Sequence, residues 1–543
     1  MTLFPQAIGP IPEATLRVAK QINRKGTLAM RLRDEFATMY TDADFVDLFP
    51  VRGQPAFSPW RLTLVTLLQF VDGLTDRQAA EAVQQRIDWK YALGLELTDP
   101  GFDFSILSEF RGRLLTHQAT QRLLEKQLQV CLDRGWITPK GNVRIDSTHV
   151  VANVRQLHQI ETVLESVHLA LEELVDHAPE WLESWMPLDW ERTYGPYSLS
   201  RRLPKSKTQR EAFAKQMGQD IEWLWKQLAH APKGMDQLPK VRLLRTIWQQ
   251  NYEQKGGVSH WRDGPKKKGS WASMIVSPND PDARISRKGD TKWVGYKGHL
   301  VESCEPGQAH LVLHVETTNA TVPDQDMLVF LHQRLIEKGF HPEKSFVDSG
   351  YVTLNTLVTS DEQQIHVVGP MGINHSWQSQ QEQGYGAEHF VVDWQARQAQ
   401  CPQGKTSVGW SDRKEDQSVL IRFSQTDCRQ CPMHAACTRA KARVLTLPNQ
   451  ERFERMQQQR EISKEEEFKR AYRTRAGVEG TIGQAVHLGF RVSRYRRQPK
   501  VEQQHIFVAV ALNMMRMDRF GRGVARAQTR QSRVTRLRQA KGA

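Results

Sequence analysis

The feature that most constrains this chain is a change of periodicity at residues 143–151, which read VRIDSTHVV. This stretch alternates and is rich in β-branched residues, so it predicts a β-strand. Residues 1–135 instead carry apolar residues at helical spacing, with Thr75 predicted as a helix N-cap and Gly94 as a helix end. A strand that follows a helical block, with more helices and strands behind it, favours an α/β layered fold.

Four later segments continue this mixed order. Strand signals lie at 293–304, 310–318 and 344–348, and a helix signal lies at 324–340. The block between the first strand and these segments is helical and rich in Trp, and most of its Trp residues are expected in a core.

These patterns predict three regions. The first is a helical domain at 1–135, which reads either as a DNA-binding module or as a plain helical bundle with solvated Arg side chains. The second is an α/β domain at 136–517 with a helical insertion at about 156–270 and a β-rich, Cys-containing insertion at about 364–447. The third is a basic tail at 518–543, predicted to be disordered.

The charge balance points to a polyanionic partner. The chain has 75 Lys and Arg against 61 Asp and Glu, for a net charge of +14. Its apolar runs, such as LTLVTLLQFV, are far shorter than the ~20 residues of a membrane span. The opening residues also lack the pattern of a secretory signal, and six Cys in 543 residues suit a reducing cytoplasm. Nucleic acid is therefore favoured over a membrane.

Three acidic residues are candidates for metal binding. Asp146 lies in the first strand, Asp348 ends the strand at 344–348, and Glu479 lies on a predicted helix with Tyr472 and Arg475 seven and four residues before it. Carboxylates suit the paired Mg²⁺ ions of phosphoryl-transfer chemistry, and Arg and Tyr suit a nearby phosphate. From the residues alone, the three acids could equally be a strand-end cap, a turn residue and a partner in a helical ion pair.

Several blocks together resemble a known family. VRIDSTHVVANV, DPDARISRKGDTKWVGYKGHLVES, SFVDSGYVT and YRTRAGVEGTIGQAVHLGFRVSRYRRQPK look like blocks of bacterial insertion-sequence DDE transposases. The N-terminal segment from FSPWRLTLVTLLQFVDGL onward resembles the InsH-type domain attached to them, and the likeness runs from about residue 40 to 517. This resemblance implies a ribonuclease-H-like catalytic core, an N-terminal DNA-binding domain and two Mg²⁺ or Mn²⁺ ions.

The resemblance also implies roles for single residues. The catalytic, metal-binding acids would be Asp146, Asp348 and Glu479. The family pattern Tyr-x2-Arg-x3-Glu is met, but the Lys expected seven residues after the Glu is replaced by Val486. The implied DNA contacts are Tyr472 and Arg475, with Arg491 or Arg494 in place of that Lys.

The resemblance implies a transposase that binds the inverted-repeat ends of an insertion sequence, cleaves DNA and joins it to a target. Two alternatives stay open: a metal-dependent nuclease without strand transfer, and a catalytically inactive DNA-binding derivative. Bringing two ends together implies at least a homodimer in the synaptic complex. The expected location is the bacterial cytoplasm, at the nucleoid.

A cluster of Cys residues suggests a separate metal site. Cys428, Cys431 and Cys437 follow a C-x2-C-x5-C spacing, and Cys401 precedes them. Four thiolates could bind a structural Zn²⁺, with His434 as a substitute ligand. The alternative is four reduced, partly buried thiols.

Overall fold

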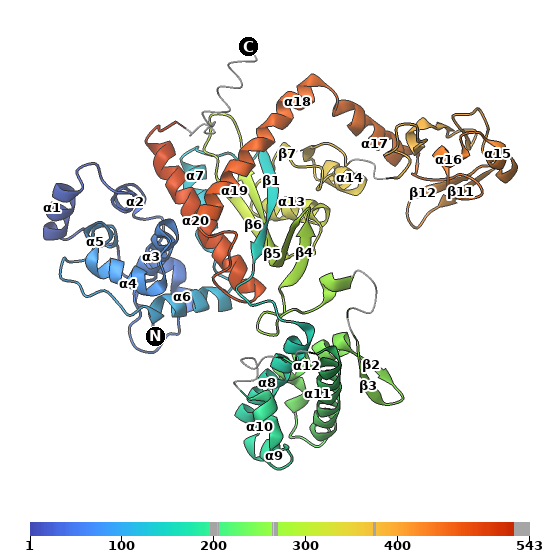
Figure 1. The fold of residues 1–543 in the computed structure, drawn as a ribbon. Coiled ribbons are helices and arrows are strands. Elements are labelled where there is room, and N and C mark those ends of the chain that lie inside the picture. Colours follow the sequence, from blue (N-terminus) through green and yellow to red (C-terminus); the bar gives the residue numbers. More distant parts are fainter. Residues whose placement is uncertain (196–202, 205, 263, 265–269, 373–375, 526–543) are drawn as a thin grey trace. The chain divides into compact units, whose positions relative to one another are not determined.

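The computed structural model describes all residues except 196–202, 205, 263, 265–269, 373–375 and 526–543 (Figure 1). The chain divides into two compact units. Unit 1 comprises residues 1–138, 146–322 and 478–543, and unit 2 comprises residues 139–145 and 323–477. Most of the predicted basic tail lies outside the described residues. No helix in the described part of the chain combines the length and apolar character needed to cross a bilayer.

The N-terminal part of unit 1 is helical, as the sequence predicted. The Thr75 side chain accepts a hydrogen bond from the Gln78 amide, which confirms the predicted N-cap, and Gly94 ends its helix with φ +63°. The helices are α1 (Glu13–Ile22), α2 (Leu28–Phe36), α3 (Pro59–Asp72), α4 (Asp76–Gln85), α5 (Ile87–Leu93), α6 (Ser105–Thr116) and α7 (Gln121–Asp133), with a 3₁₀ turn at Asp42–Leu48.

Helices α2, α3, α6 and α7 pack on the long helix α20 (Gln498–Gly521), which is buried almost all round over residues 503–514 (Figure 1). The rings of Phe70 on α3 and Phe507 on α20 lie 5.7 Å apart, and the Gln127 side chain of α7 donates to the Val510 carbonyl at 3.1 Å. Residues 1–138 therefore pack on the C-terminal helix within unit 1.

The main sheet of unit 1 contains β4 (Arg284–Lys288), β5 (Thr291–Ser303) and β6 (Val312–Asn319), which pair antiparallel, and β1 (Val143–Val151) lies next to β5. In β5 and β6, His299 pairs with Glu316, and the register shifts between Val301 and Glu302. The strand predictions for 143–151, 293–304 and 310–318 are confirmed.

A helical insertion with its own core follows β1. It contains α8 (Gln159–His177), α9 (Pro179–Glu183), α10 (Asp189–Tyr194), α11 (Lys207–Leu228) and α12 (Pro239–Asn251), then the hairpin β2 (Tyr252–Lys255) and β3 (Val258–Trp261). Trp190 is buried in this core and Trp181, Trp185, Trp225 and Trp248 pack against it, whereas Trp223 is 44% exposed. The expectation that most of these Trp residues are structural is confirmed.

Unit 2 contains a parallel arrangement. The first residues of β1 pair in parallel with β7 (Lys344–Phe346), and β7 pairs in parallel with β8 (His366–Val368). Helices α13 (Leu328–Glu337) and α14 (Leu354–Glu362) precede and follow β7. Parallel neighbours need such helical crossovers, so the chain is mixed α/β. The strands β1, β7 and β8 of unit 2 are parallel, whereas the pairs between residues 391 and 448 of the same unit are antiparallel.

The rest of unit 2 holds the predicted β-rich segment and a run of helices. The strands are β9 (Val391–Asp393), β10 (Gln398–Gln400), β11 (Gly409–Arg413), β12 (Ser418–Arg422) and β13 (Val444–Pro448). The helices are α15 (Gln425–Gln430), α16 (His434–Cys437), α17 (Gln450–Ile462) and α18 (Glu466–Tyr472). Phe390, Ile421 and Leu445 form a small core between the strands.

Candidate active site

Asp146 lies on the buried part of β1 in unit 1. Its side chain is 8% exposed, and one carboxylate oxygen accepts the Ser147 amide at 2.8 Å. Because side chains alternate along a strand, Thr148 lies on the same face as Asp146. The Arg491 guanidinium donates to the Thr148 hydroxyl from Nε at 3.2 Å and Nη2 at 2.8 Å. A basic side chain therefore reaches the strand face that carries Asp146.

The chain after α19 (Gly477–His487) is tied to the end of β1. The Val151 amide donates to the Arg491 carbonyl at 2.8 Å, and the Ser493 amide donates to the Val151 carbonyl at 2.9 Å. Nearby, burial together with the charges of Arg491 and Lys288 lowers the pKa of His149. These backbone bonds fix the position of Arg491 beside β1.

Glu479 lies on the exposed face of α19. Val478, Thr481, Ile482 and Ala485 form the buried face, following the i, i+3, i+4, i+7 pattern of an amphipathic helix. Since Glu479 lies about 200° around the helix from Thr481, its carboxylate points away from the packed face.

Asp348 lies in unit 2, two residues beyond the end of β7. One carboxylate oxygen accepts a hydrogen bond from the Gly350 amide at 2.9 Å, as in an Asx turn. Asp348 is thus a turn residue in its local contact, as one of the alternatives predicted. The other oxygen lies 3.8 Å from Nη2 of Arg475. Unit 2 therefore brings together two of the predicted site residues that lie far apart in the sequence.

The structure corrects the prediction that Tyr472, Arg475 and Glu479 lie on one continuous α-helix. Tyr472 ends α18, Arg475 lies in a 3₁₀ turn at Arg473–Ala476, and α19 begins at Gly477. The Tyr472 ring stacks on Phe468 with centroids 5.9 Å apart. A spacing of three and four residues thus does not put these side chains on a single helical face.

Two residues that the sequence analysis did not single out explain this break. The Arg144 guanidinium, on β1, donates to the Thr474 carbonyl at 3.0 Å. It lies against the Gly477 backbone, where any Cβ would collide with it. A side chain at position 477 would therefore force the Arg144 guanidinium to move away from the Thr474 carbonyl.

Arg494 has contacts inside the protein. Nη1 donates to the Leu74 carbonyl at 2.9 Å, and the guanidinium carbon lies 4.7 Å from the Phe70 ring centroid. Arg494 therefore joins the N-terminal helices to the segment after α19, whereas Arg491 reaches the Asp146 face of β1.

The four clustered cysteines line one cavity of about 290 Å³ in unit 2. The Lys405 amide donates to Cys401 Sγ at 3.3 Å, and the Arg443 amide donates to Cys428 Sγ at 3.4 Å. All four are free thiols, and burial raises the pKa of Cys437. The ring nitrogen Nε2 of His434 lies 3.1 Å from the Ala440 carbonyl oxygen. Soft sulfur donors that face one cavity have the right chemistry for Zn²⁺.

Four cysteines that line one cavity do not by themselves form a zinc site. Among the residues that the structure describes, no group of three or more His, Cys, Asp or Glu side chains is arranged to hold a metal ion. Zinc binding by the four cysteines therefore stays a prediction.

Comparison with known families identifies the chain. Residues 17–113 match the family described as "Transposase domain (DUF772)", and residues 400–518 match the "Transposase DDE domain". The chain therefore carries a transposase DDE domain together with an N-terminal DUF772 transposase domain, an arrangement typical of insertion-sequence transposases. No curated protein and no solved structure matches it.

The matched regions cover part of the predicted site. The DDE match contains Tyr472, Arg475, Glu479 and the cysteine cluster, whereas Asp146 and Asp348 precede it. A DDE domain is that of a phosphoryl-transfer enzyme acting on DNA, and such enzymes generally use divalent metal ions.

Proposed function

We propose that this transposase binds the inverted-repeat ends of an insertion sequence and catalyses Mg²⁺-dependent DNA cleavage and strand transfer. The observation that carries the proposal is the approach of Arg475 to Asp348 in unit 2, at 3.8 Å. Both residues were assigned to the site from sequence blocks more than 100 residues apart. Such a meeting is expected of residues that share one functional site.

Three carboxylates, Asp146, Asp348 and Glu479, would hold the metal ions. Carboxylate oxygens are the ligands that Mg²⁺ prefers, and two ions bound by such a set would stabilise the attacking and leaving oxygens of the phosphodiester. Within unit 2, Arg144 of β1 pairs with Phe346 of β7 in a parallel ladder, and Asp348 follows Phe346 by two residues.

The same strands support a ribonuclease-H-like core. In unit 1 the antiparallel pair β5–β6 lies next to β1, and in unit 2 β7 and β8 continue in parallel from β1. Carboxyl ends of parallel strands meet at one sheet edge, which is where ligands bind in α/β sheets. Asp348 follows β7 at that edge.

Basic side chains would hold the DNA backbone. Arg475, beside Asp348, and Arg491, on the strand face that carries Asp146, are suited to contact the phosphates that flank the scissile bond. The Tyr472 hydroxyl could add a further contact. We expect Arg494 to contribute less to DNA binding, because its guanidinium already contacts the Leu74 carbonyl and the Phe70 ring. In this proposal the N-terminal helices bind the repeat ends, two protomers join two ends, and the protein acts on nucleoid DNA in the cytoplasm.

Incubation with labelled DNA tests the proposal. The substrate would carry the segments that border the coding sequence on either side, with Mg²⁺ and a target plasmid. Joined products are expected from a transposase, and cleavage without joining would support the nuclease alternative. Asp348→Asn is expected to lower cleavage and joining on the order of 10⁴-fold, as loss of one member of a catalytic set does, while end binding persists.

A matched control distinguishes loss of the proposed site from loss of any ion-paired carboxylate in unit 2. Asp361 on α14 also pairs with an arginine, Arg455, at 3.1 Å, and Asp361→Asn should leave both reactions unchanged. Full activity of Asp348→Asn would refute the assignment. End binding without any cleavage by the unsubstituted chain would favour the inactive DNA-binding alternative.

A further inference from the structure

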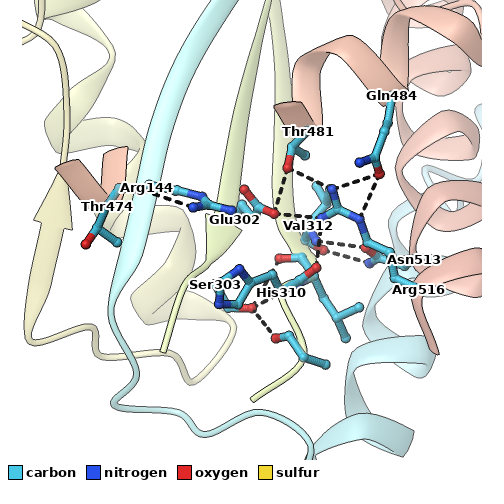
Figure 2. A network of polar contacts seen from close by, with 12 residues as sticks. Arg144, Glu302, Ser303, His310, Val312, Thr474, Thr481, Gln484, Asn513 and Arg516 are labelled. Carbon is cyan, nitrogen blue, oxygen red and sulfur yellow. Dashed lines mark hydrogen bonds and ion pairs between the residues drawn. The ribbon is translucent and has the colours of Figure 1, made fainter. Parts of the chain in front are cut away.

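The buried face of α19 is held by a polar anchor and not by apolar contacts alone (Figure 2). The Thr481 hydroxyl donates to Oε1 of Glu302, on β5, at 2.7 Å. The Glu302 side chain is fully buried, with 0% exposure, and Thr481 is 2% exposed. An acid inside a strand is costly to bury unless its charge has partners, and the Thr481 hydroxyl of α19 is one of them.

Arg516 of α20 connects the anchor to two more elements. Nη1 donates to Oε1 of Glu302 at 2.7 Å and to the His310 carbonyl at 2.8 Å. Nη2 donates to the Thr481 hydroxyl at 2.8 Å and to the Gln484 side-chain oxygen at 3.1 Å. One rigid guanidinium therefore spans β5, α19, α20 and the segment before β6, all within unit 1 (Figure 2).

Helix α20 is itself fixed at this point. The Asn513 side chain, three residues before Arg516, accepts the Val312 amide at 2.8 Å and donates to the Val312 carbonyl at 2.9 Å. Because Asn513 bonds both backbone groups of one β6 residue, α20 has a single register on the strand. Arg516 thus projects from a helix that cannot slide.

A buried ion pair is weak support for stability, since desolvation offsets most of the attraction. Its directional bonds can fix the orientation of α19, which the apolar side chains of Val478, Ile482 and Ala485 cannot do alone. Apolar packing is non-directional and tolerates small rotations, whereas hydrogen bonds at fixed lengths select one rotation and one height of the helix.

The rotation of α19 matters because of Glu479. This residue precedes Thr481 by two positions, on the opposite side of the helix. We propose that Arg516, acting through Glu302 and Thr481, is a positioning residue that fixes the direction of the Glu479 carboxylate. The inference rests on the proposed function, in which Glu479 is a metal ligand.

Thr481→Val tests the inference, because valine keeps the shape of threonine and removes the hydroxyl. Thr481→Ser restores the hydroxyl, and Thr246→Val on α12 is a matched control for an exposed threonine in the same unit. The first readout is Mn²⁺ affinity of the full chain, measured with the metal alone by electron paramagnetic resonance. The second is the cleavage rate on the flanking DNA, with end affinity and thermal unfolding recorded in parallel.

We expect Thr481→Val to weaken Mn²⁺ binding about 10-fold and to slow cleavage about 10- to 100-fold, with end affinity unchanged. Thr481→Ser should recover both within about 3-fold, a difference of less than 1 kcal/mol. Gln484→Leu, which removes an acceptor of Arg516 at an exposed position, should cause a smaller loss of the same kind and keeps the test available if the valine variant unfolds.

Two results would overturn the inference. One is unchanged Mn²⁺ affinity and cleavage in both Thr481→Val and Gln484→Leu. The other is an equal loss in Thr481→Ser and Thr481→Val. A separate Glu479→Gln arm distinguishes the failure of the proposed function: if that variant cleaves normally and keeps its Mn²⁺ affinity, Glu479 is not a ligand at all.

Discussion

Acidification should loosen the part of unit 2 that carries Asp348, and His332 is the cause. This residue lies on α13 with no exposed surface. Its Nε2 lies 2.9 Å from the Ser345 hydroxyl on β7, and its Nδ1 lies 3.3 Å from the Ser360 hydroxyl on α14. Burial lowers the pKa of His332 from 6.5 to about 3.

The sign and size of the effect follow from proton linkage. Below pH 6.5 the unfolded chain takes up a proton at this position that the folded chain resists, so stability falls as the pH falls and levels off only near pH 3. Each pH unit in that window costs about 1.4 kcal/mol. Between pH 7 and pH 5 the loss of stability is about 2 kcal/mol. It is less than two full pH units would give because His332 of the unfolded chain is only partly protonated near pH 7.

Hydrogen exchange measures this loss locally. Opening free energies of peptides that cover α13, β7 and α14 would be compared at pH 7 and pH 5, after correction for the intrinsic exchange rate. His332→Gln keeps an amide donor and acceptor, cannot be protonated, and should remove most of the difference; substitution of the exposed His341 should not. A drop of about 2 kcal/mol that persists in His332→Gln would refute the reasoning.

Three further predictions concern the metal and DNA sites. Elemental analysis should find about one zinc per chain, as expected for a Cys₄ site, and Cys431→Ser should lower it; a purified chain without zinc would end the zinc proposal. Gly477→Ala should destabilise the protein by about 1–3 kcal/mol in thermal unfolding because its methyl group meets Arg144, whereas Gly480→Ala, with open space around it, should be neutral or stabilising; equal effects would contradict the steric account. Arg491→Gln should reduce the slope of log affinity against log salt for end DNA by about 1, and an unchanged slope would remove Arg491 from the phosphate contacts.

The sequence was most informative where local pattern and fold agree. The strand at 143–151 was predicted with its boundaries, and the Thr75 cap and the Gly94 end were predicted from side-chain and backbone chemistry. The mixed α/β class followed from the order of these signals. Each of these features depends on residues within a few positions of one another.

The sequence was least informative where a contact comes from far along the chain. The 3₁₀ turn at Arg473–Ala476 depends on Arg144, some 330 residues earlier, and no local spacing encodes that partner. Glu302 could have been found, because it is an acid inside a predicted strand, as Asp146 is. The contact between Glu302 and Arg516 could not have been predicted from the sequence, since this contact requires the packing of α20 on β6.

Iron-directed cleavage of the protein backbone tests the central claim most directly. Fe²⁺ that replaces Mg²⁺ would generate hydroxyl radicals with ascorbate and peroxide, and the cut positions would be mapped by mass spectrometry. The account predicts cuts next to Asp146, Asp348 and Glu479 together, all of them lost in Asp348→Asn. Cuts beside only one of the three acids, or a pattern that Asp348→Asn leaves unchanged, would contradict it.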